Sequence, residues 1–430
     1  MSNLRLFCLV LLFGAVMCGA EPIRWSQSGF DSSPDGWTRW APREEIAPRA
    51  FLETSVSRGQ PNSLAVAADG NAAAFGGWQY TLSGIQPRVF YRFLAHYRCE
   101  RVAQESLQIL ARLDWLSASG KRVSQPEHPW LVSRDGAWRR LSMEVPAPED
   151  AAAVKIQLFL RNAPNATVWW DDLSFHEIPD PGPRNVRIAS VNLRPRQTGS
   201  AQASVDRFLQ LIGSSVSAAD IILLPEGITM IGTGKSFPEV AESVPGPTTA
   251  RLAEMARRKR AYIAAGIYER DGTAIYNTAV LLDREGNLAG KYRKVYLPRE
   301  ELEGGLTPGS SYPVFPTDFG KVGMMICWDV QFADPARHLA LQGAEILLVP
   351  IWGGDLSLAK ARAIENRVFL VSSGYDYPTH IMDPNGEILS QAASDGSIAY
   401  SVIDLNRRYL DRWLGDMRAR FHKEVRLDLP

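Results

Sequence analysis

The sequence predicts two folded parts of different class: an antiparallel β-sandwich over residues 22–180 and an α/β domain over residues 185–430. Short alternating runs separated by turn residues fill the first part, without long helical periodicity, which is typical of a sandwich. In the second part apolar runs alternate with amphipathic helical stretches, which predicts a sheet covered by helices. Between them lies PDPGP (179–183), whose prolines cannot continue a strand and therefore mark a domain boundary.

Composition limits the classes of partner. The chain of 430 residues carries 47 basic and 47 acidic residues, so its formal net charge is zero. A nucleic-acid partner would require a basic face, and this balance argues against one. The length alone suggests about two to three domains.

The first twenty residues predict export. They contain one basic residue (Arg5), an apolar stretch over 6–17, and small residues at Gly19 and Ala20, a pattern typical of a signal peptide cut near Ala20. The apolar stretch is short for a membrane span. We therefore expect a periplasmic or secreted protein. Lipoprotein anchoring through Cys18 is an alternative, although the preceding residues fit that motif poorly, and an uncleaved anchor is another.

The first part is read as a set of strands rich in tryptophan. Strands are expected at 90–97, 106–116, 139–145, 154–159 and 167–175. Tryptophan is frequent in this part, and the residues include Trp37, Trp40, Trp78, Trp115, Trp130, Trp138, Trp169 and Trp170. Aromatic side chains can stack on sugars, but they also dominate core burial. The sandwich is therefore expected either to bind a carbohydrate or to serve a structural role.

The second part alternates strands and helices throughout. Strands are expected at 186–193, 221–224, 262–268, 276–282, 322–326, 346–350, 369–374 and 398–404. Helices are expected at 201–214, 248–259, 334–343 and 357–367, and over the charged segment 407–426 with Trp413 and Phe421 as anchors.

Two cysteines remain after removal of residues 1–20, Cys99 and Cys327. An exported protein usually pairs its cysteines, but these two lie in different predicted parts, so we expect no bridge between them. Cys99 lies in an alternating strand and is expected to be buried. Cys327 ends an apolar strand where the chain turns toward a helix, a position at which a thiolate is stabilised by free N–H groups. The alternative is a small apolar residue that completes a core strand.

Two other polar residues follow strands in the second part. Glu226 comes directly after IILLP, and Lys294 lies in KYRKVYLP (291–298). Each could be a surface charge by itself. Together with Cys327 they provide a nucleophile, a general base and a cation for an oxyanion, which is the combination that amide hydrolysis needs.

Residues 185–430 resemble the nitrilase, or carbon–nitrogen hydrolase, superfamily. The matching motifs are LLPEG (223–227), YRKVYLPREE (292–301), TPG (307–309), GMMICWD (323–329), AEILLVP (344–350) and ENRVFLVSSG (365–374). The resemblance implies an αββα sandwich and a Glu-Lys-Cys triad. Glu226 would be the general base and Cys327 the nucleophile that forms a thioester. Lys294 and the backbone N–H of Trp328 would stabilise the oxyanion.

The resemblance also implies a second glutamate near the substrate or water. Glu300, Glu301 and Glu303 are candidates, and Glu301, seven residues after Lys294, is preferred. The loops at 230–244 and 352–359 are expected to shape the pocket.

The reaction type follows from the residues after the nucleophile. Nitrilases commonly have Cys-Trp-Glu, whereas this chain has Cys-Trp-Asp, which looks more like amidases and carbamoyl-amide hydrolases. We therefore expect hydrolysis of linear amides, with N-carbamoyl-amide or nitrile hydrolysis as alternatives. A ligand-binding protein with the hydrolase fold as scaffold, or an acyltransferase, would be other functions for the same chain. The six histidines are scattered without metal spacing, so neither metal nor cofactor is expected.

Two further expectations rest on resemblance. Relatives of this type commonly form homodimers, here through helices at 334–341 and 357–367. The first part resembles carbohydrate-binding modules of the jelly-roll, galactose-binding-like type, through Gly36-Trp37, the strand at 91–97 and VWWDDLSFHEI (168–178).

Overall fold

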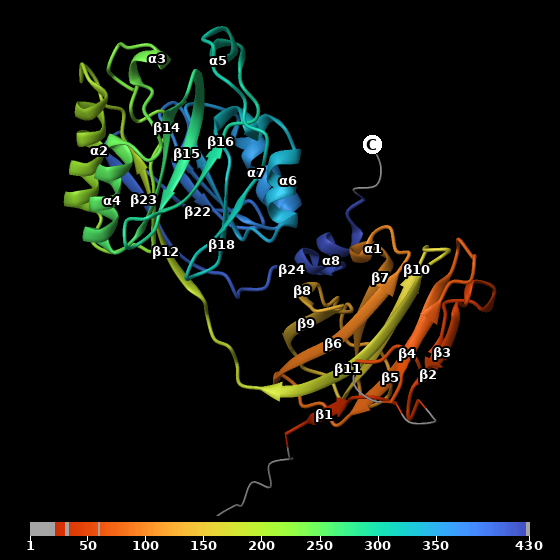
Figure 1. Ribbon diagram of the computed structural model, residues 1–430. Helices are drawn as coiled ribbons and strands as arrows, with labels where there is room; N and C mark the ends of the chain where they lie inside the picture. The colour runs from red at the N-terminus through yellow and green to blue at the C-terminus, as the bar shows by residue number, and fades with distance from the viewer. Residues whose placement is uncertain (1–21, 31–33, 59–60, 427–430) are drawn as a thin grey trace, which may run out of the picture. The chain divides into compact units, whose positions relative to one another are not determined.

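The computed structural model describes residues 22–30, 34–58 and 61–426 (Figure 1). The predicted signal peptide, with Cys18, lies outside the described residues. Contacts divide the chain between Asp180 and Pro181 into two compact units. None of the described helices is long and apolar enough to cross a membrane.

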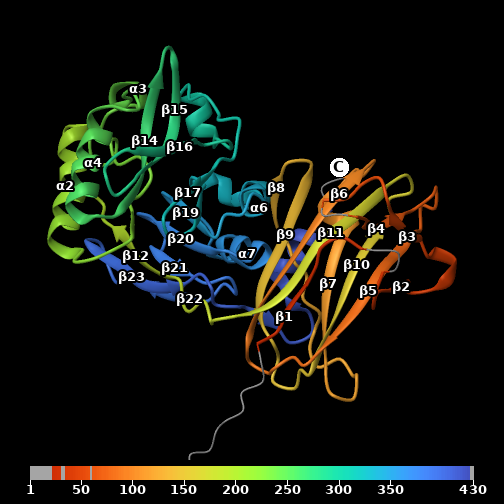
Figure 2. The same cartoon turned by 60° about the horizontal axis from the view of Figure 1, so that its bottom comes forward.

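In the first unit the described residues form two antiparallel sheets (Figure 2). The larger has the strand order β3-β4-β11-β6-β9-β8, and β1 also pairs with β11. Its strands are β1 (Arg24–Gln27), β3 (Arg49–Glu53), β4 (Ser63–Ala67), β6 (Phe90–Glu100), β8 (Leu131–Asp135), β9 (Trp138–Pro146) and β11 (Thr167–Ile178). The smaller sheet has the order β2-β5-β10-β7, from β2 (Thr38–Trp40), β5 (Phe75–Ser83), β7 (Ile109–Leu116) and β10 (Ala153–Arg161).

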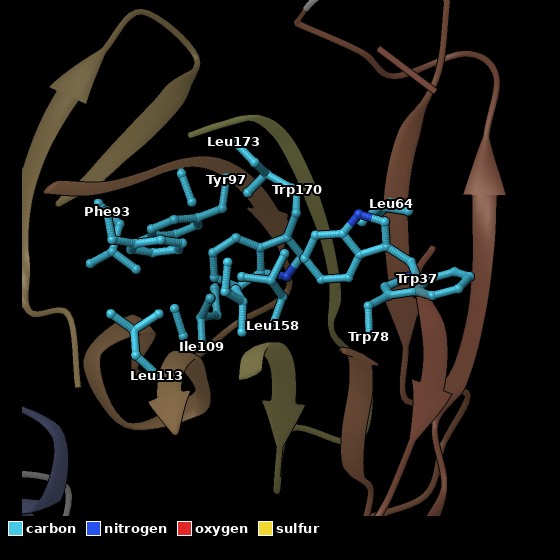
Figure 3. Close-up of a cluster of buried hydrophobic side chains, with 14 of the residues drawn as sticks. Trp37, Leu64, Trp78, Phe93, Tyr97, Ile109, Leu113, Leu158, Trp170 and Leu173 are labelled. Atoms are coloured by element: carbon cyan, nitrogen blue, oxygen red, sulfur yellow. The ribbon is translucent and has the colours of Figure 1, made fainter. Parts of the chain in front are cut away.

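One apolar core is shared by these two sheets (Figure 3). Side chains of one face of each strand meet there because successive residues of a strand point to opposite faces. Six of the nine tryptophans in residues 22–180 are buried: Trp37, Trp78, Trp115, Trp138, Trp169 and Trp170. Most of the tryptophans are thus structural, and Trp25, Trp40 and Trp130 are partly exposed. The jelly-roll assignment stays a prediction.

The strand expected at 106–116 begins later than the pattern predicts. Glu105–Gln108 form a short helical turn, α1, and β7 starts at Ile109. Glu105 is held by the Tyr97 hydroxyl, which donates to its carboxylate at 3.0 Å, and by Arg139 at 3.0 Å. These contacts favour the helical turn, and the local alternation of apolar and polar residues gives no sign of them.

The second unit contains two six-stranded sheets among the described residues. The first has the order β16-β15-β14-β13-β12-β23: β12 (Asn185–Asn192), β13 (Ile221–Leu223), β14 (Tyr262–Asp271), β15 (Ala274–Leu282), β16 (Leu288–Arg293) and β23 (Ser397–Asp404). The second has the order β17-β18-β19-β20-β21-β22: β17 (Val314–Pro316), β18 (Lys321–Met324), β19 (Ile346–Pro350), β20 (Phe369–Ser373), β21 (His380–Met382) and β22 (Ile388–Gln391).

Helices cover the outer face of each sheet. Figure 1 shows α2 (Ala201–Ser215) and α4 (Pro247–Lys259) on one side of the unit and α6 (Asp334–Leu341) and α7 (Leu356–Asn366) on the other. Three separate apolar clusters fill the layers of this unit. One lies between the two sheets, one lies between α2, α4 and the first sheet, and one lies between α6, α7 and the second sheet. These layers are the αββα sandwich, so the fold expected for the second part is confirmed.

The parallel strands of both sheets end at the same edge of this unit. β12, β13 and β14 are parallel in one sheet, and β18, β19 and β20 are parallel in the other. Near the ends of β12 and β20, the Ser190 hydroxyl donates to the carbonyl of Ser372 at 2.6 Å, and the Ser373 hydroxyl donates to the carbonyl of Val191 at 2.5 Å. Residues that follow β13 and β18, Glu226 and Cys327 among them, therefore lie at one edge, where α/β proteins place their sites.

The prediction for the C-terminal segment is partly wrong. Within 407–426 only α8 (Met417–Glu424) is an α-helix, and β24 (Leu410–Asp411) and β25 (Gly415–Asp416) form a small hairpin before it. The Asp411 carboxylate accepts from the N–H groups of Trp413 (2.7 Å) and Leu414 (2.9 Å) and closes the turn. Trp413 is 77% exposed and anchors nothing in this unit, whereas Phe421 is buried.

Candidate active site

Glu226 is fixed by the chain around it. Beyond β13, the N–H of Gly266 donates to the carbonyl of Pro225 at 3.0 Å, and the N–H of Ile228 donates to that of Gly266 at 2.9 Å. A Cβ on Gly266 would lie 2.7 Å from the Cα of Glu226, so this close approach requires glycine. The Tyr375 hydroxyl donates to the carbonyl of Glu226 at 2.9 Å. The Glu226 carboxylate is thereby held in the interior, 2% exposed.

Lys294 continues from β16 beside Asn277 of β15. The N–H of Lys294 donates to the carbonyl of Asn277 at 2.9 Å, and the N–H of Gly309 donates to that of Lys294 at 2.7 Å. A Cβ on Gly309 would lie 2.1 Å from the carbonyl oxygen of Arg293, which explains the glycine of the TPG motif. The Lys294 side chain is 1% exposed and reaches the same interior space as Glu226.

Lys294 lies between two carboxylates. Its Nζ is 3.0 Å from Glu226 Oε1 and 2.9 Å from Glu301 Oε2. Asn277 Nδ2 donates to Oε1 of both glutamates at 2.7 Å. Glu226 Oε1 therefore accepts two hydrogen bonds, whereas Glu226 Oε2 is buried and has no partner among the described residues. This arrangement leaves one oxygen of Glu226 available as a base.

The carboxylates keep Lys294 charged. Burial by itself would lower the pKa of Lys294, but Glu226 and Glu301 outweigh burial and raise that pKa above its ordinary value. Burial also raises the pKa of Glu301, against the lowering effect of Lys294. Lys294 is consequently a permanent cation at neutral pH, as an oxyanion site requires.

Cys327 begins a tight turn. It follows β18 and Ile326 and opens the 3-10 helix Cys327–Gln331, while α6 starts only at Asp334. Its φ of +43° lies in the left-handed region, which is strained for a side chain other than glycine. The sequence predicted a strand-to-helix corner, and the first element after the strand is this 3-10 turn.

Asp329 holds the turn in place. Its Oδ2 accepts from the N–H of Ile326 (2.8 Å) and the Tyr292 hydroxyl (2.7 Å), and its Oδ1 accepts from the N–H of Tyr296 (3.0 Å). Burial raises the pKa of Asp329 to about 6, although these hydrogen bonds lower it. They favour the charged carboxylate that fixes the backbone around the thiol.

The thiol of Cys327 is protonated at rest. Burial raises its pKa to about 12, an effect to which the Glu226 carboxylate adds and which Lys294 opposes. The Sγ lies 3.5 Å from the carbonyl oxygen of Gly353, to which the thiol donates. A protonated thiol needs a base to remove its proton when it attacks. The Glu226 carboxylate is the candidate base, because its charge already affects the pKa of this thiol.

Of the three candidate second glutamates, the structure brings Glu301 to the cluster. Glu301 lies in α5 (Arg299–Glu303) and is 6% exposed. The side chains of Glu300 and Glu303 are 74% and 70% exposed and lie near Arg299. Trp328 follows Cys327 in the turn, and its side chain is 40% exposed.

Comparison with known proteins decides the family. The sequence model of the family described as "Carbon-nitrogen hydrolase" matches residues 187–413, which is more than half of the chain. The chain belongs to the carbon–nitrogen hydrolase family. The matched residues contain Glu226, Lys294, Glu301 and Cys327 and lie within the second unit.

Two relatives and one solved structure illustrate the similarity. Human omega-amidase NIT2 is 31% identical over 221 residues, covering 45% of this chain and 80% of the relative. The probable nitrilase C965.09 of Schizosaccharomyces pombe is 33% identical over 239 residues, covering 50% and 88%. The carbon–nitrogen hydrolase from Helicobacter pylori G27 is 21% identical with a TM-score of 0.46, covering 57% of this chain and 96% of that one.

The sequence reasoning on this hydrolase missed two residues of the cluster. Asn277 lies in the strand AIYNTAVLL. A side-chain amide in a largely apolar, buried strand indicates that other polar groups must form hydrogen bonds with it in the interior. Tyr375 lies directly after the ENRVFLVSSG motif and gave no such signal. Among the described residues, no group of three or more His, Cys, Asp or Glu side chains is arranged to hold a metal ion.

Proposed function

We propose that this carbon–nitrogen hydrolase is an amidase that cleaves a linear, non-peptide amide through a thioester on Cys327. The observation that carries the proposal is the buried cluster in which Lys294 and Asn277 bind Oε1 of Glu226 and leave Oε2 without a partner. The relatives named omega-amidase support the choice of an amide, as does the Cys-Trp-Asp sequence.

Acylation begins with the thiol. Glu226 Oε2 accepts the proton of Cys327, and the sulfur attacks the amide carbon, so that a C–S bond forms and the carbonyl oxygen becomes an oxyanion. Lys294 and the backbone N–H of Trp328 stabilise this charge. The intermediate collapses as the C–N bond breaks, and the proton on Glu226 passes to the departing nitrogen.

Deacylation reverses the proton path. Glu226 takes a proton from water, the hydroxide attacks the thioester carbon, and the C–S bond breaks as the sulfur regains the proton. Glu301, on the other side of Lys294, positions the water or the substrate. The products are a carboxylic acid and ammonia or an amine, and no other reactant is consumed.

Other activities remain as alternatives. An N-carbamoyl-amide hydrolase or a nitrilase would use the same residues, and one relative carries the name probable nitrilase. A glycan-binding protein with the hydrolase fold as scaffold is less consistent with a buried Lys294 between two carboxylates, because that arrangement costs stability without chemistry. An acyltransferase would need an amine in place of water.

The test is a panel of substrates with a shared carbon skeleton. Linear amides, N-carbamoyl amides and nitriles are given to the chain lacking residues 1–20, and the release of ammonia is measured. We expect the amides to give the highest kcat/KM. Faster turnover of the nitriles or carbamoyl compounds would replace the amidase assignment, and product formation that depends on an added amine would indicate an acyltransferase.

Three features of the whole protein are also proposed. Residues 1–20 support export to the periplasm or medium, and the first unit could bind a carbohydrate at Trp40 or Trp130. A homodimer would form through α7, whose Ile364 is 40% exposed. In α6, the other helix expected at the interface, the apolar residues Ala336, Leu339 and Ala340 are buried in the core of this unit.

A further inference from the structure

Tyr268 lies on the same face of the first sheet as the catalytic cluster. It stands in β14 directly opposite Asn277 of β15, and opposite residues of an antiparallel pair have their side chains on one face. Tyr262 and Ala264, which precede Tyr268 in the same alternation, belong to the apolar cluster between the two sheets. The Tyr268 side chain therefore lies on the inner face, next to the asparagine that binds both glutamates.

The chain beside Glu226 is shaped to accept the ring of Tyr268. A Cβ on Gly227, the residue after Glu226, would lie 3.1 Å from Cε2 of that ring and 3.5 Å from its hydroxyl oxygen. Gly227 also has a φ of +61°, a conformation that favours glycine. The hydroxyl of Tyr268 consequently lies close to the backbone that carries the general base.

Other contacts fix the ring of Tyr268 in one place. Phe237 of α3 (Phe237–Val240) packs against it, with 4.9 Å between the ring centres. The carbonyl of Tyr268 accepts from the N–H of Glu242 at 3.1 Å, which holds its backbone. Only 2% of Tyr268 is exposed. The hydroxyl is thus held in a defined position, as a group that orients a reactant must be.

This hydroxyl is a donor without a partner. It forms no hydrogen bond in the part of the chain that the structure describes. Burial, and then the nearby charges of Glu226 and Glu301, raise the pKa of Tyr268 well above its ordinary value, and Cys327 is also close enough to contribute. Tyr268 therefore stays protonated at neutral pH beside the carboxylates and the thiol.

Two acceptors of the cluster also lack a partner. Glu226 Oε2 and Asn277 Oδ1 are buried and form no hydrogen bond with any described residue. The unpartnered groups are thus two acceptor oxygens and one hydroxyl donor. A water molecule has the complementary set, because it donates two hydrogen bonds and accepts from a hydroxyl.

We propose that the Tyr268 hydroxyl donates a hydrogen bond to the water that hydrolyses the acyl-enzyme, and so orients it for attack. Glu226 Oε2 takes one proton of that water, and its oxygen bonds to the thioester carbon. The C–S bond breaks, the Cys327 sulfur regains the proton from Glu226, and Tyr268 keeps its own proton throughout. This inference rests on the proposed thioester mechanism and adds a catalytic residue to its deacylation step.

The test separates acylation from deacylation with p-nitrophenyl acetate, whose activated ester acetylates a thiol directly. In the chain lacking residues 1–20, the burst of p-nitrophenol measures acylation and the following steady rate measures deacylation. Tyr268→Phe removes the hydroxyl and keeps the ring against Phe237. We expect its burst rate to change by less than about threefold and its steady rate to fall by about ten- to hundredfold.

Hydroxylamine distinguishes a lost water contact from a general disturbance of the site. It is a much stronger nucleophile than water and removes the acetyl group as acetohydroxamate. At a fixed hydroxylamine concentration, we expect Tyr268→Phe to raise the ratio of hydroxamate to acetate by about tenfold or more, because only the water route loses its donor. An unchanged ratio, with both routes slowed equally, would show a structural role and overturn the assignment.

Tyr262→Phe is the matched control. It makes the same substitution on the inner face of β14, but Tyr262 pairs with Ile221 at the start of β13, whereas Glu226 lies beyond the end of that strand. We expect both of its rates to be normal. The same loss in Tyr262→Phe, or a slower burst with a normal steady rate in Tyr268→Phe, would contradict a role in deacylation.

The ester makes the result independent of the amidase assignment. If the protein hydrolyses its acetyl thioester but no amide, a slower steady rate in Tyr268→Phe still supports the role of the hydroxyl, and only the amidase function fails. If amides are hydrolysed and Tyr268→Phe deacylates at the wild-type rate, the amidase function stands and the role of Tyr268 is rejected.

Discussion

Cys327→Ala is expected to lower amide turnover by about four orders of magnitude or more, because no other group can form the thioester. Alanine removes only the Sγ, and the Asp329 carboxylate keeps the hydrogen bonds that it accepts from the N–H groups of Ile326 and Tyr296. The variant should therefore fold normally. Ammonia release under saturating amide measures kcat, and circular dichroism with a thermal melt checks the fold.

Cys99→Ala is the control for this variant. Cys99 is a free, half-buried thiol in β6, and burial raises its pKa to about 11 without any catalytic group beside it. We expect at most a small loss of stability, on the order of 1 kcal/mol, and normal turnover. An inactive Cys99→Ala protein together with an active Cys327→Ala protein would refute the assignment of the nucleophile.

Lys294→Met should lower kcat by about two to three orders of magnitude and change KM far less. The ammonium group interacts with the substrate chiefly when the oxyanion forms, so its loss is felt in the transition state. The methionine also leaves Glu226 and Glu301 facing each other without a cation, which we expect to cost several kcal/mol of stability.

The loss of stability must be separated from the loss of rate. Denaturant unfolding of the Lys294→Met variant gives the fraction folded at the assay temperature, and kcat is corrected for it. If the corrected kcat is normal and only KM rises, Lys294 binds substrate and does not stabilise the oxyanion.

The central strands of the second unit, such as β13, β19 and β20, were predictable because they are buried on both faces. The apolar run at 346–350 was placed at the bounds of β19, and the motifs located Glu226, Lys294 and Cys327. Glu226 and Cys327 closely follow strongly apolar runs, so the local pattern marked both, whereas Lys294 follows β16 (LAGKYR), which no apolar run marks, and only the motif located it.

Other features depend on contacts that no local pattern contains. Asn277 joins Glu226 and Glu301, which are 51 and 24 residues away in sequence, so its role emerges only when β15 lies beside both. The choice of Glu301 over its neighbours depends on how one helical turn faces the interior. In the C-terminal segment, the charged composition suggested a helix, but the turn closed by Asp411 places Leu410 and Trp413 in a hairpin.

The most direct test of the central claim is to trap the acyl-enzyme. Protein lacking residues 1–20 is mixed rapidly with an amide, quenched in acid and mapped by mass spectrometry of its peptides. We predict an added acyl group on the peptide that contains Cys327, removable by hydroxylamine as a thioester is, and absent from Cys327→Ala. Full turnover with no adduct on Cys327, or with the acyl group on another residue, would contradict the account.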